Sequence, residues 1–232
     1  MTSVTSNPAD FHRRLTEACR QFALPIDEQR IAKLLRYIDQ LQRWNRTYNL
    51  TAVRDPGEML VQHVFDSLAV VKPLDEALPA ANAKLMDVGS GGGLPGVVLA
   101  VLRPAWHVEC VDAVEKKTAF IQQMSSALEL PNLEARHARV ETLPPADCDI
   151  VISRAFASLA DFANLAGSHV KNGGSLVAMK GKTPEAEIQA LQQQGAWLVK
   201  NIETLQVPEL DAERCLIWMV RRSATNETTG TP

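Results

Sequence analysis

The segment LMDVGSGGGLPG, residues 85–96, limits the possible folds of this chain more than any other part of its sequence. A short apolar run leads into a turn with four glycines in five residues, and Pro95 then opens a helical pattern. Glycine adopts positive φ and lets a ligand approach the backbone. Proline suits the first turn of a helix, whose free N–H groups attract anions. This strand–turn–helix segment predicts an α/β fold that binds a nucleotide-like ligand at the turn.

Short apolar runs alternate with helical patterns from Lys84 onward, which is typical of a parallel sheet. No helical pattern separates the last two apolar runs, so we expect them to form an antiparallel pair at the sheet edge. The predicted strands are Lys84–Val88, His107–Asp112, Leu133–His137, Asp149–Arg154, Ser175–Lys180, Trp197–Leu205 and Cys215–Arg221. The predicted helices between them are Pro95–Leu102, Glu115–Leu128, Leu159–Val170 and Pro184–Gln194.

The amino-terminal third has the apolar spacing of amphipathic helices, over Phe11–Ala23 and Asp27–Trp44. A third helix is expected after the cap residue Asp55, ending where Pro73 begins a connection to Lys84. We therefore expect a flexible start (1–10), a helical cap (11–72), a sheet domain (84–222) and a disordered polar tail (223–232).

Composition excludes several other classes of protein. The chain has 232 residues and is 46% hydrophobic, enough for one substantial core. It has neither a signal-peptide pattern nor an apolar run of about 18 residues, so we expect a cytoplasmic protein that does not enter a membrane. The four cysteines (Cys19, Cys110, Cys148, Cys215) and five histidines make no metal-binding pattern, so we expect no metal.

The net charge of −3 shows that the chain is not basic overall. A protein that grips nucleic acid mainly through phosphate neutralisation carries a positive charge excess. Any contact with RNA must therefore be local. The candidate basic clusters are Arg13 with Arg14, Arg43 with Arg46, Lys116 with Lys117, Arg136 with Arg139, and Lys180 with Lys182.

Two kinds of ligand fit the glycine turn. Gly91, Gly93 and Gly96 match the dinucleotide pattern GxGxxG, so a nicotinamide-dependent oxidoreductase is one interpretation. Asp87 extends the pattern to DxGxGxG, which favours S-adenosyl-L-methionine, because a carboxylate there can receive the ammonium of a methionine moiety. Asp112 ends the next strand, 23 positions after Gly89. It can accept both ribose hydroxyls of an adenosine, or alternatively cap the helix that follows.

The acceptor should lie where the strand 149–154 ends, because open α/β sheets bind ligands at the carboxyl edge. This strand end has neither an Asn/Asp-Pro-Pro-aromatic turn nor a cysteine after it; Cys148 precedes the strand. No catalytic base or nucleophile is evident. Such a site suits an acceptor that is already a lone-pair nucleophile, such as a purine ring nitrogen, which needs chiefly alignment. Arg154 and Lys180, at neighbouring strand ends, are candidates for binding phosphate, a base edge or the donor carboxylate.

Motifs along most of the chain resemble the ribosomal RNA small subunit methyltransferase G family, also called glucose-inhibited division protein B. The residues that carry the resemblance are Trp44-Asn45, Tyr48 to Arg54, His63 to Leu68, Asp87 to Gly96, Ser153 to Leu159, Lys180-Gly181, Leu205 to Pro208 and Glu213-Arg214. The resemblance implies a Rossmann-like, class I S-adenosylmethionine-dependent methyltransferase. Its sheet has seven, mostly parallel, strands and carries an N-terminal helical cap.

The resemblance further implies methyl transfer to N7 of a guanine in the decoding-region loop of 16S rRNA, with rRNA or the small ribosomal subunit as partner. It places donor contacts on Gly89, Leu94, Val140, Glu141 and Arg154. We expect a monomer. For Tyr48, His63 and Asp66 both packing and RNA contact remain open. The alternatives are a non-catalytic RNA-binding or regulatory protein that retains the donor pocket, and a small-molecule methyltransferase.

Overall fold

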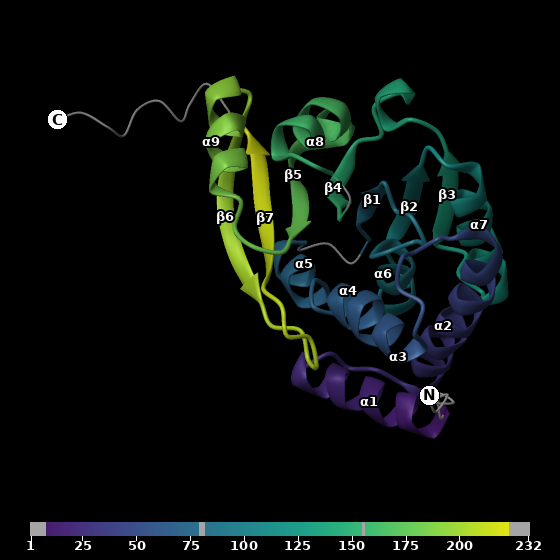
Figure 1. Ribbon diagram of the computed structural model, residues 1–232. Helices are drawn as coiled ribbons and strands as arrows, with labels where there is room; N and C mark the ends of the chain where they lie inside the picture. Colours follow the sequence, from purple (N-terminus) through teal and green to yellow (C-terminus); the bar gives the residue numbers. More distant parts are fainter. Residues whose placement is uncertain (1–7, 79–81, 155, 223–232) are drawn as a thin grey trace.

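A seven-stranded sheet in the order β3-β2-β1-β4-β5-β7-β6 forms the centre of the computed structural model (Figure 1). The structure describes residues 8–78, 82–154 and 156–222. The strands are β1 (Lys84–Val88), β2 (His107–Asp112), β3 (Leu133–His137), β4 (Cys148–Ser153), β5 (Val170–Lys180), β6 (Trp197–Leu205) and β7 (Arg214–Arg221). β1 to β5 are parallel, and β7 is antiparallel to both β5 and β6. The predicted mostly parallel sheet with an antiparallel edge is confirmed.

Alternation along the strands creates two hydrophobic cores. Leu85 packs into a core with the N-terminal helices, α6 (Gly96–Leu102) and α7 (Glu115–Ala127). The next residue, Met86, packs on the opposite face. That second core includes residues of α8 (Leu159–Ala166) and α9 (Glu185–Gln194). Because neighbouring side chains of a strand point to opposite faces, a strand buried on both faces becomes apolar throughout.

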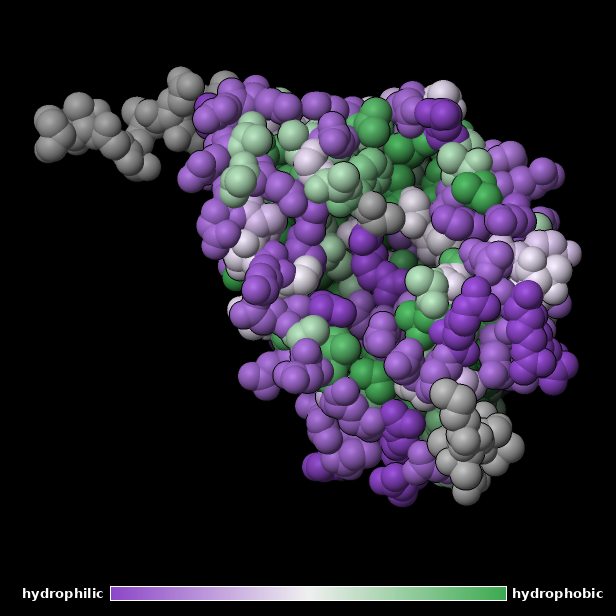
Figure 2. All heavy atoms as spheres, in the orientation of Figure 1, coloured by the Kyte–Doolittle hydropathy of each residue, from purple (hydrophilic) through white to green (hydrophobic). Residues whose placement is uncertain are grey.

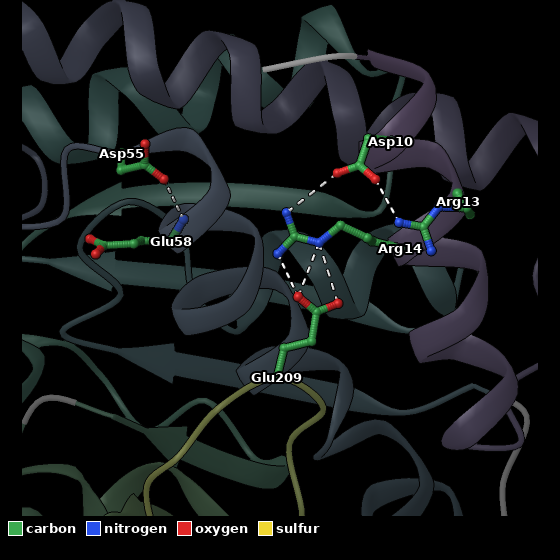
Figure 3. Close-up of polar contacts among 6 residues, drawn as sticks. All are labelled: Asp10, Arg13, Arg14, Asp55, Glu58 and Glu209. Atoms are coloured by element: carbon green, nitrogen blue, oxygen red, sulfur yellow. Dashed lines mark hydrogen bonds and ion pairs between the residues drawn. The ribbon is translucent and has the colours of Figure 1, made fainter. Parts of the chain in front are cut away.

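The N-terminal helices are α1 (Pro8–Gln21), α2 (Glu28–Tyr48), α3 (Pro56–Met59), the π-helical turn η1 (Leu60–Phe65), α4 (Asp66–Leu68) and α5 (Val71–Ala77). Asp27 caps α2 by accepting a hydrogen bond from Arg30 N, and Asp55 caps α3 through Glu58 N (Figure 3). The single third helix expected from the sequence is thus divided by a π turn, a feature often found at functional sites.

Two predicted boundaries of the helical segment were wrong. Pro73 does not end a helix but lies in the first turn of α5. It fits there because the first N–H groups of a helix have no partner within the helix, so a missing N–H costs little. At the other end, α1 begins at Pro8, so residues 8–10 are helical rather than flexible. The rest of that expectation, residues 1–7, and the predicted tail 223–232 lie outside the described residues.

An ion pair ties α1 to the loop between β6 and β7, which Figure 1 shows reaching down to this helix. Arg14 Nε and Nη2 lie 3.0 and 2.7 Å from Glu209 Oε2, and Arg14 Nη1 lies 3.9 Å from Asp10 Oδ2 (Figure 3). The loop leads directly into β7, which begins at Arg214. The contact therefore helps to fix the strand end that carries Arg214.

Candidate active site

The glycine turn after β1 needs its glycines for both conformation and space. Gly89, Gly91 and Gly93 have φ of 69°, 60° and 87°, values that side chains rarely adopt. A Cβ on Gly96 would overlap Cys110 Sγ and lie 2.9 Å from Asp87 Oδ2. The turn therefore packs directly against the sheet beneath it, and its exposed side is bare backbone.

Two buried carboxylates hold this turn from below. Asp87 Oδ2 accepts a hydrogen bond from Gly96 N at 2.8 Å, and Asp112 Oδ2 accepts one from Gly91 N at 2.9 Å. Asp112 Oδ1 also accepts from Val114 N at 2.9 Å. Since Val114 is the N-cap of α7 and has no side-chain cap bond, Asp112 is not the cap of that helix. Both aspartates instead fix the path of the turn.

Asp87 lies beneath the turn rather than along a cavity. Its side chain is fully buried, and its Oδ1 has no hydrogen-bond partner among the described residues. Burial raises the pKa of Asp87 to about 7, against the opposing effects of the Gly96 hydrogen bond and the Arg154 charge. The carboxylate therefore changes its charge near neutral pH.

Tyr37 of α2 holds the turn from above, a role that sequence reasoning missed. Its hydroxyl donates a hydrogen bond to the carbonyl oxygen of Gly92 at 2.7 Å, and the side chain is fully buried. Burial raises the pKa of Tyr37 well above its usual range, so the hydroxyl stays a donor. The signal was a tyrosine in the middle of an apolar helix face, where a buried hydroxyl needs a partner.

A first cavity of about 190 Å³ lies over the turn. Its lining combines turn backbone, apolar side chains and two cations: Leu41, Leu50, Thr51, His63, Gly89, Ser90, Gly91, Gly92, Leu94, Lys117 and Arg154. Asn45 shapes the loop that brings Leu50 and Thr51 to this cavity. Its Nδ2 donates to Val53 O at 3.0 Å and its Oδ1 accepts from Thr51 N at 2.9 Å.

His63 lines this cavity and also a neighbouring one. The side chain is 6% exposed, and its Nε2 lies 2.8 Å from Thr51 Oγ1. Burial, aided by the charge of Arg154, lowers the pKa of His63 to about 4. The imidazole is therefore neutral at physiological pH.

The second cavity, of about 340 Å³, lies at the carboxyl edge of β4 and β5. It is lined by Gln62, His63, Asp66, Arg154, Met179, Lys180, Gly181 and Arg214. It shares His63 and Arg154 with the first cavity. Figure 2 shows that the middle of this face of the molecule is hollowed and lined largely by hydrophilic side chains.

A buried carboxylate joins two arginines in the second cavity. Asp66 Oδ2 lies 3.2 Å from Arg154 Nη1, and Asp66 Oδ1 accepts from Arg214 Nε at 2.7 Å. Arg154 Nη1 also donates to Gln62 O at 3.1 Å. Arg154 directly follows β4, so the predicted residue does lie at the carboxyl edge, whereas Arg214 was not predicted as a site residue.

Lys180 lines the second cavity, but its ammonium has partners within the protein. Lys180 Nζ lies 2.8 Å from Glu187 Oε2 and 3.1 Å from the carbonyl oxygen of Phe156. The same Glu187 oxygen accepts a hydrogen bond from Leu159 N, at the start of α8. Lys180 thus fixes the segment that follows β4.

Other predicted site residues lie apart from the two cavities. Val140 and Glu141 are in the short 3-10 turn η2 (Val140–Thr142) after β3 and line neither cavity. Tyr48 is 42% exposed and its ring centroid lies 4.9 Å from that of Trp44. Cys148 is buried, which raises the pKa of its thiol to about 12 and leaves it protonated.

The described residues contain neither a metal-binding cluster nor a membrane-spanning helix. Within 8–78, 82–154 and 156–222, no group of three or more His, Cys, Asp or Glu side chains is placed to hold a metal ion. No helix in these ranges is long and apolar enough to cross a bilayer.

The sheet order, the glycine turn and the cavity above it define a Rossmann-like methyltransferase fold. A solved structure with this fold is an S-adenosylmethionine-dependent methyltransferase from Aquifex aeolicus. It matches with a TM-score of 0.57 at 17% sequence identity, over 74% of this chain and 96% of that chain.

The chain belongs to the rRNA small subunit methyltransferase G family, whose sequence profile matches residues 30–217. The ribosomal RNA small subunit methyltransferase G of Bordetella pertussis (strain Tohama I) is 66% identical over 230 residues, 97% of this chain and 100% of its own length. The protein of the same name from Leptothrix cholodnii is 50% identical over 91% of this chain and 96% of its own length. The predicted family is confirmed, and S-adenosyl-L-methionine, rather than a nicotinamide dinucleotide, is the cofactor.

Replacing Tyr37 by Phe should loosen the glycine turn, because the carbonyl of Gly92 loses its buried donor. We expect a loss of about 1 kcal/mol in the free energy of unfolding and weaker binding of S-adenosyl-L-homocysteine, measured by urea titration and calorimetry. Tyr48→Phe makes the same atomic change at an exposed position of the same helix and should alter neither quantity. Equal behaviour of the two variants would contradict the assigned role of Tyr37.

Asp87→Asn should change how stability depends on pH. The folded-state pKa of about 7 lies above the ordinary aspartate pKa of 3.8, so the folded protein binds this proton more tightly than the unfolded chain does. The stabilisation by this group is complete below about pH 4 and is lost as the pH rises through 7. The unfolding free energy of the parent, minus that of Asp87→Asn, should therefore fall over this interval and then level off. A difference in unfolding free energy that stays constant at pH 5, 6, 7 and 8, measured by urea unfolding, would refute this.

Proposed function

We propose that the protein transfers the methyl group of S-adenosyl-L-methionine to N7 of a guanine in the decoding-region (530) loop of 16S rRNA. The observation that carries this proposal is the junction of the two cavities at His63 and Arg154. When bound, the donor supplies an electrophilic methyl group on a sulfonium. Methyl transfer needs the acceptor atom close to that methyl and in line with it. Adjacent cavities over the glycine turn and the β4 end can hold the two reactants in this way.

The glycine turn suits the donor for reasons of space and charge. We assign its methionine part to the first cavity, against the backbone of Gly89, Gly91 and Leu94, which line it; Gly93, also expected to contact the donor, does not line this cavity. The guanidinium of Arg154 can pair with its carboxylate. Ser90 and His63 also line this cavity and add polar groups beside the donor.

We assign the adenosine part of the donor to the other end of the turn. Asp112 ends β2 there and can reach the ribose hydroxyls, and Val140 and Glu141 of η2 follow the neighbouring strand β3. Asp87 acts from beneath, by holding the amide of Gly96, because it does not line the cavity.

The cavity lining favours an acceptor that needs no deprotonation. Among the described residues that line the two cavities, Asp66 is the only carboxylate, and both of its oxygens face arginines. His63 is too weak a base at neutral pH, and no cysteine lines either cavity. Transfer to an exocyclic amine or a ring carbon needs a base or a nucleophile, whereas N7 of guanine already offers a lone pair.

An RNA substrate fits the charge of the second cavity. Arg154 and Arg214 provide two local cations, of which Asp66 balances one, in a chain whose net charge is −3. An enzyme that modifies a base must receive it unstacked from its neighbours, and the 340 Å³ cavity offers space for it. We propose a monomer and, since rRNA is the substrate, a cytoplasmic location.

The direct test uses labelled S-adenosyl-L-methionine with naked 16S rRNA and with small ribosomal subunits, both from a strain that lacks the modification. We expect label at one guanine N7 in at least one substrate. Label at another atom would contradict the N7 assignment. No label despite donor binding would favour the non-catalytic RNA-binding alternative.

Replacing Arg154 by Ala should lower methyl transfer at least tenfold, because the side chain lines both cavities, while the cooperative unfolding transition is retained. Arg20→Ala is the matched control, since Arg20 is an exposed arginine paired with Glu17 on α1 and belongs to none of the candidate basic clusters. The control should transfer methyl groups at the parental rate. Unchanged transfer in Arg154→Ala would remove Arg154 from the site.

A further inference from the structure

Asp66 stands out because it is a buried charge shared by two elements that are far apart in the sequence. Its side chain is 4% exposed. Arg154 and Arg214, its partners, lie 88 and 148 residues away along the chain. Burying a carboxylate is costly unless it is paired and hydrogen-bonded, so the position requires both arginines.

The two arginines serve different cavities. Arg154 lines both the first and the second cavity, whereas Arg214 lines only the second. Asp66 contacts a single nitrogen of each guanidinium, Nη1 of Arg154 and Nε of Arg214. A guanidinium carries five N–H donors in a fixed fork. Each arginine can therefore be held by Asp66 and still present an edge to a ligand.

We propose that Asp66 is a positioning residue that fixes Arg154 at the first cavity and Arg214 at the second cavity. In this way it sets the position of the acceptor nucleotide relative to the donor. This inference rests on the proposed function, in which the first cavity holds the donor and the second receives the acceptor RNA. Asp66 itself does not act on the reacting atoms. Arg214 becomes a binding residue for the RNA, through a phosphate or a base edge.

The surroundings make Asp66 a rigid support. It directly follows the π turn η1, where its N–H donates to the carbonyl oxygen of His63. The hydroxyl of Ser67 donates to the same oxygen at 2.6 Å. On the other side, the loop that leads into Arg214 is tied to α1 by the Arg14–Glu209 ion pair (Figure 3). The group of Asp66, Arg154 and Arg214 is therefore held in place from both sides.

The sign of the charge separates positioning from simple attraction. Asp66→Asn removes a negative charge from a cationic cavity, so electrostatic attraction of RNA should be unchanged or stronger. Loss of the shared support should nevertheless misplace both guanidiniums. Misplacement of about 1 Å can cost a reaction on the order of 100-fold in rate. We therefore expect a fall in kcat without a rise in KM for RNA.

The experiment compares kcat and KM for the small ribosomal subunit or naked 16S rRNA, whichever the parent methylates faster, together with S-adenosyl-L-homocysteine binding and thermal unfolding. The variants are Asp66→Asn and Asp66→Glu, and Asp75→Asn is the matched control. Asp75 Oδ1 accepts a hydrogen bond from Arg103 Nε at 2.6 Å, and neither residue lines a cavity of the site. Asp66→Glu keeps the charge, so both cations stay paired while their positions shift.

We expect kcat to fall at least tenfold in Asp66→Asn and Asp66→Glu, with KM for RNA not raised and with Asp75→Asn at the parental rate. A kcat within twofold of the parent in Asp66→Glu, or in a folded Asp66→Asn, would overturn the inference. So would a raised KM with unchanged kcat. If Asp66→Asn does not fold, Asp66→Glu alone decides. Because each rate is compared with the parent's own rRNA methylation, a wrong assignment of the methylated atom would leave this test intact.

Discussion

Hydrogen bonds from the backbone of the glycine turn to two buried carboxylates are the interactions on which the rest of the site depends. Asp87 and Asp112 lie on adjacent parallel strands and accept hydrogen bonds from the backbone N–H groups of Gly96 and Gly91, respectively. Tyr37 holds the same turn from the opposite side through Gly92. The bare backbone that lines the first cavity is thereby fixed between the sheet and the N-terminal helices before any ligand binds.

The N-terminal helical segment and the sheet both contribute residues to the two cavities. The sheet supplies the glycine turn and Arg154, and the segment after α2 supplies Thr51, His63 and Asp66. Burial keeps His63 neutral, and Asp66 balances one of the two arginine charges beside it. The result is a site with little capacity to remove a proton but with cations placed for RNA. This combination suits an acceptor that reacts through its own lone pair.

Local patterns predicted much of this structure. Short apolar runs between helical patterns predicted all seven strands, and the pattern from Asp87 to Gly96 predicted the turn where the first cavity lies. Arg154 was found because a polar residue after a buried strand must lie at the carboxyl edge. Contacts between distant segments could not be predicted from local patterns, because nothing in the sequence near Asp66 points to Arg214, 148 residues away. Likewise, Lys180 looked available for a ligand until the structure showed its ammonium beside Glu187.

In the proposed function, donor and acceptor occupy two adjacent cavities that meet at Arg154 and His63. A crystal structure with S-adenosyl-L-homocysteine and a fragment of 16S rRNA that contains the modified guanine tests it most directly. We expect the homocysteine part over the glycine turn and the guanine in the second cavity, with N7 facing the sulfur. A guanine bound elsewhere, with the second cavity left empty, would contradict this placement.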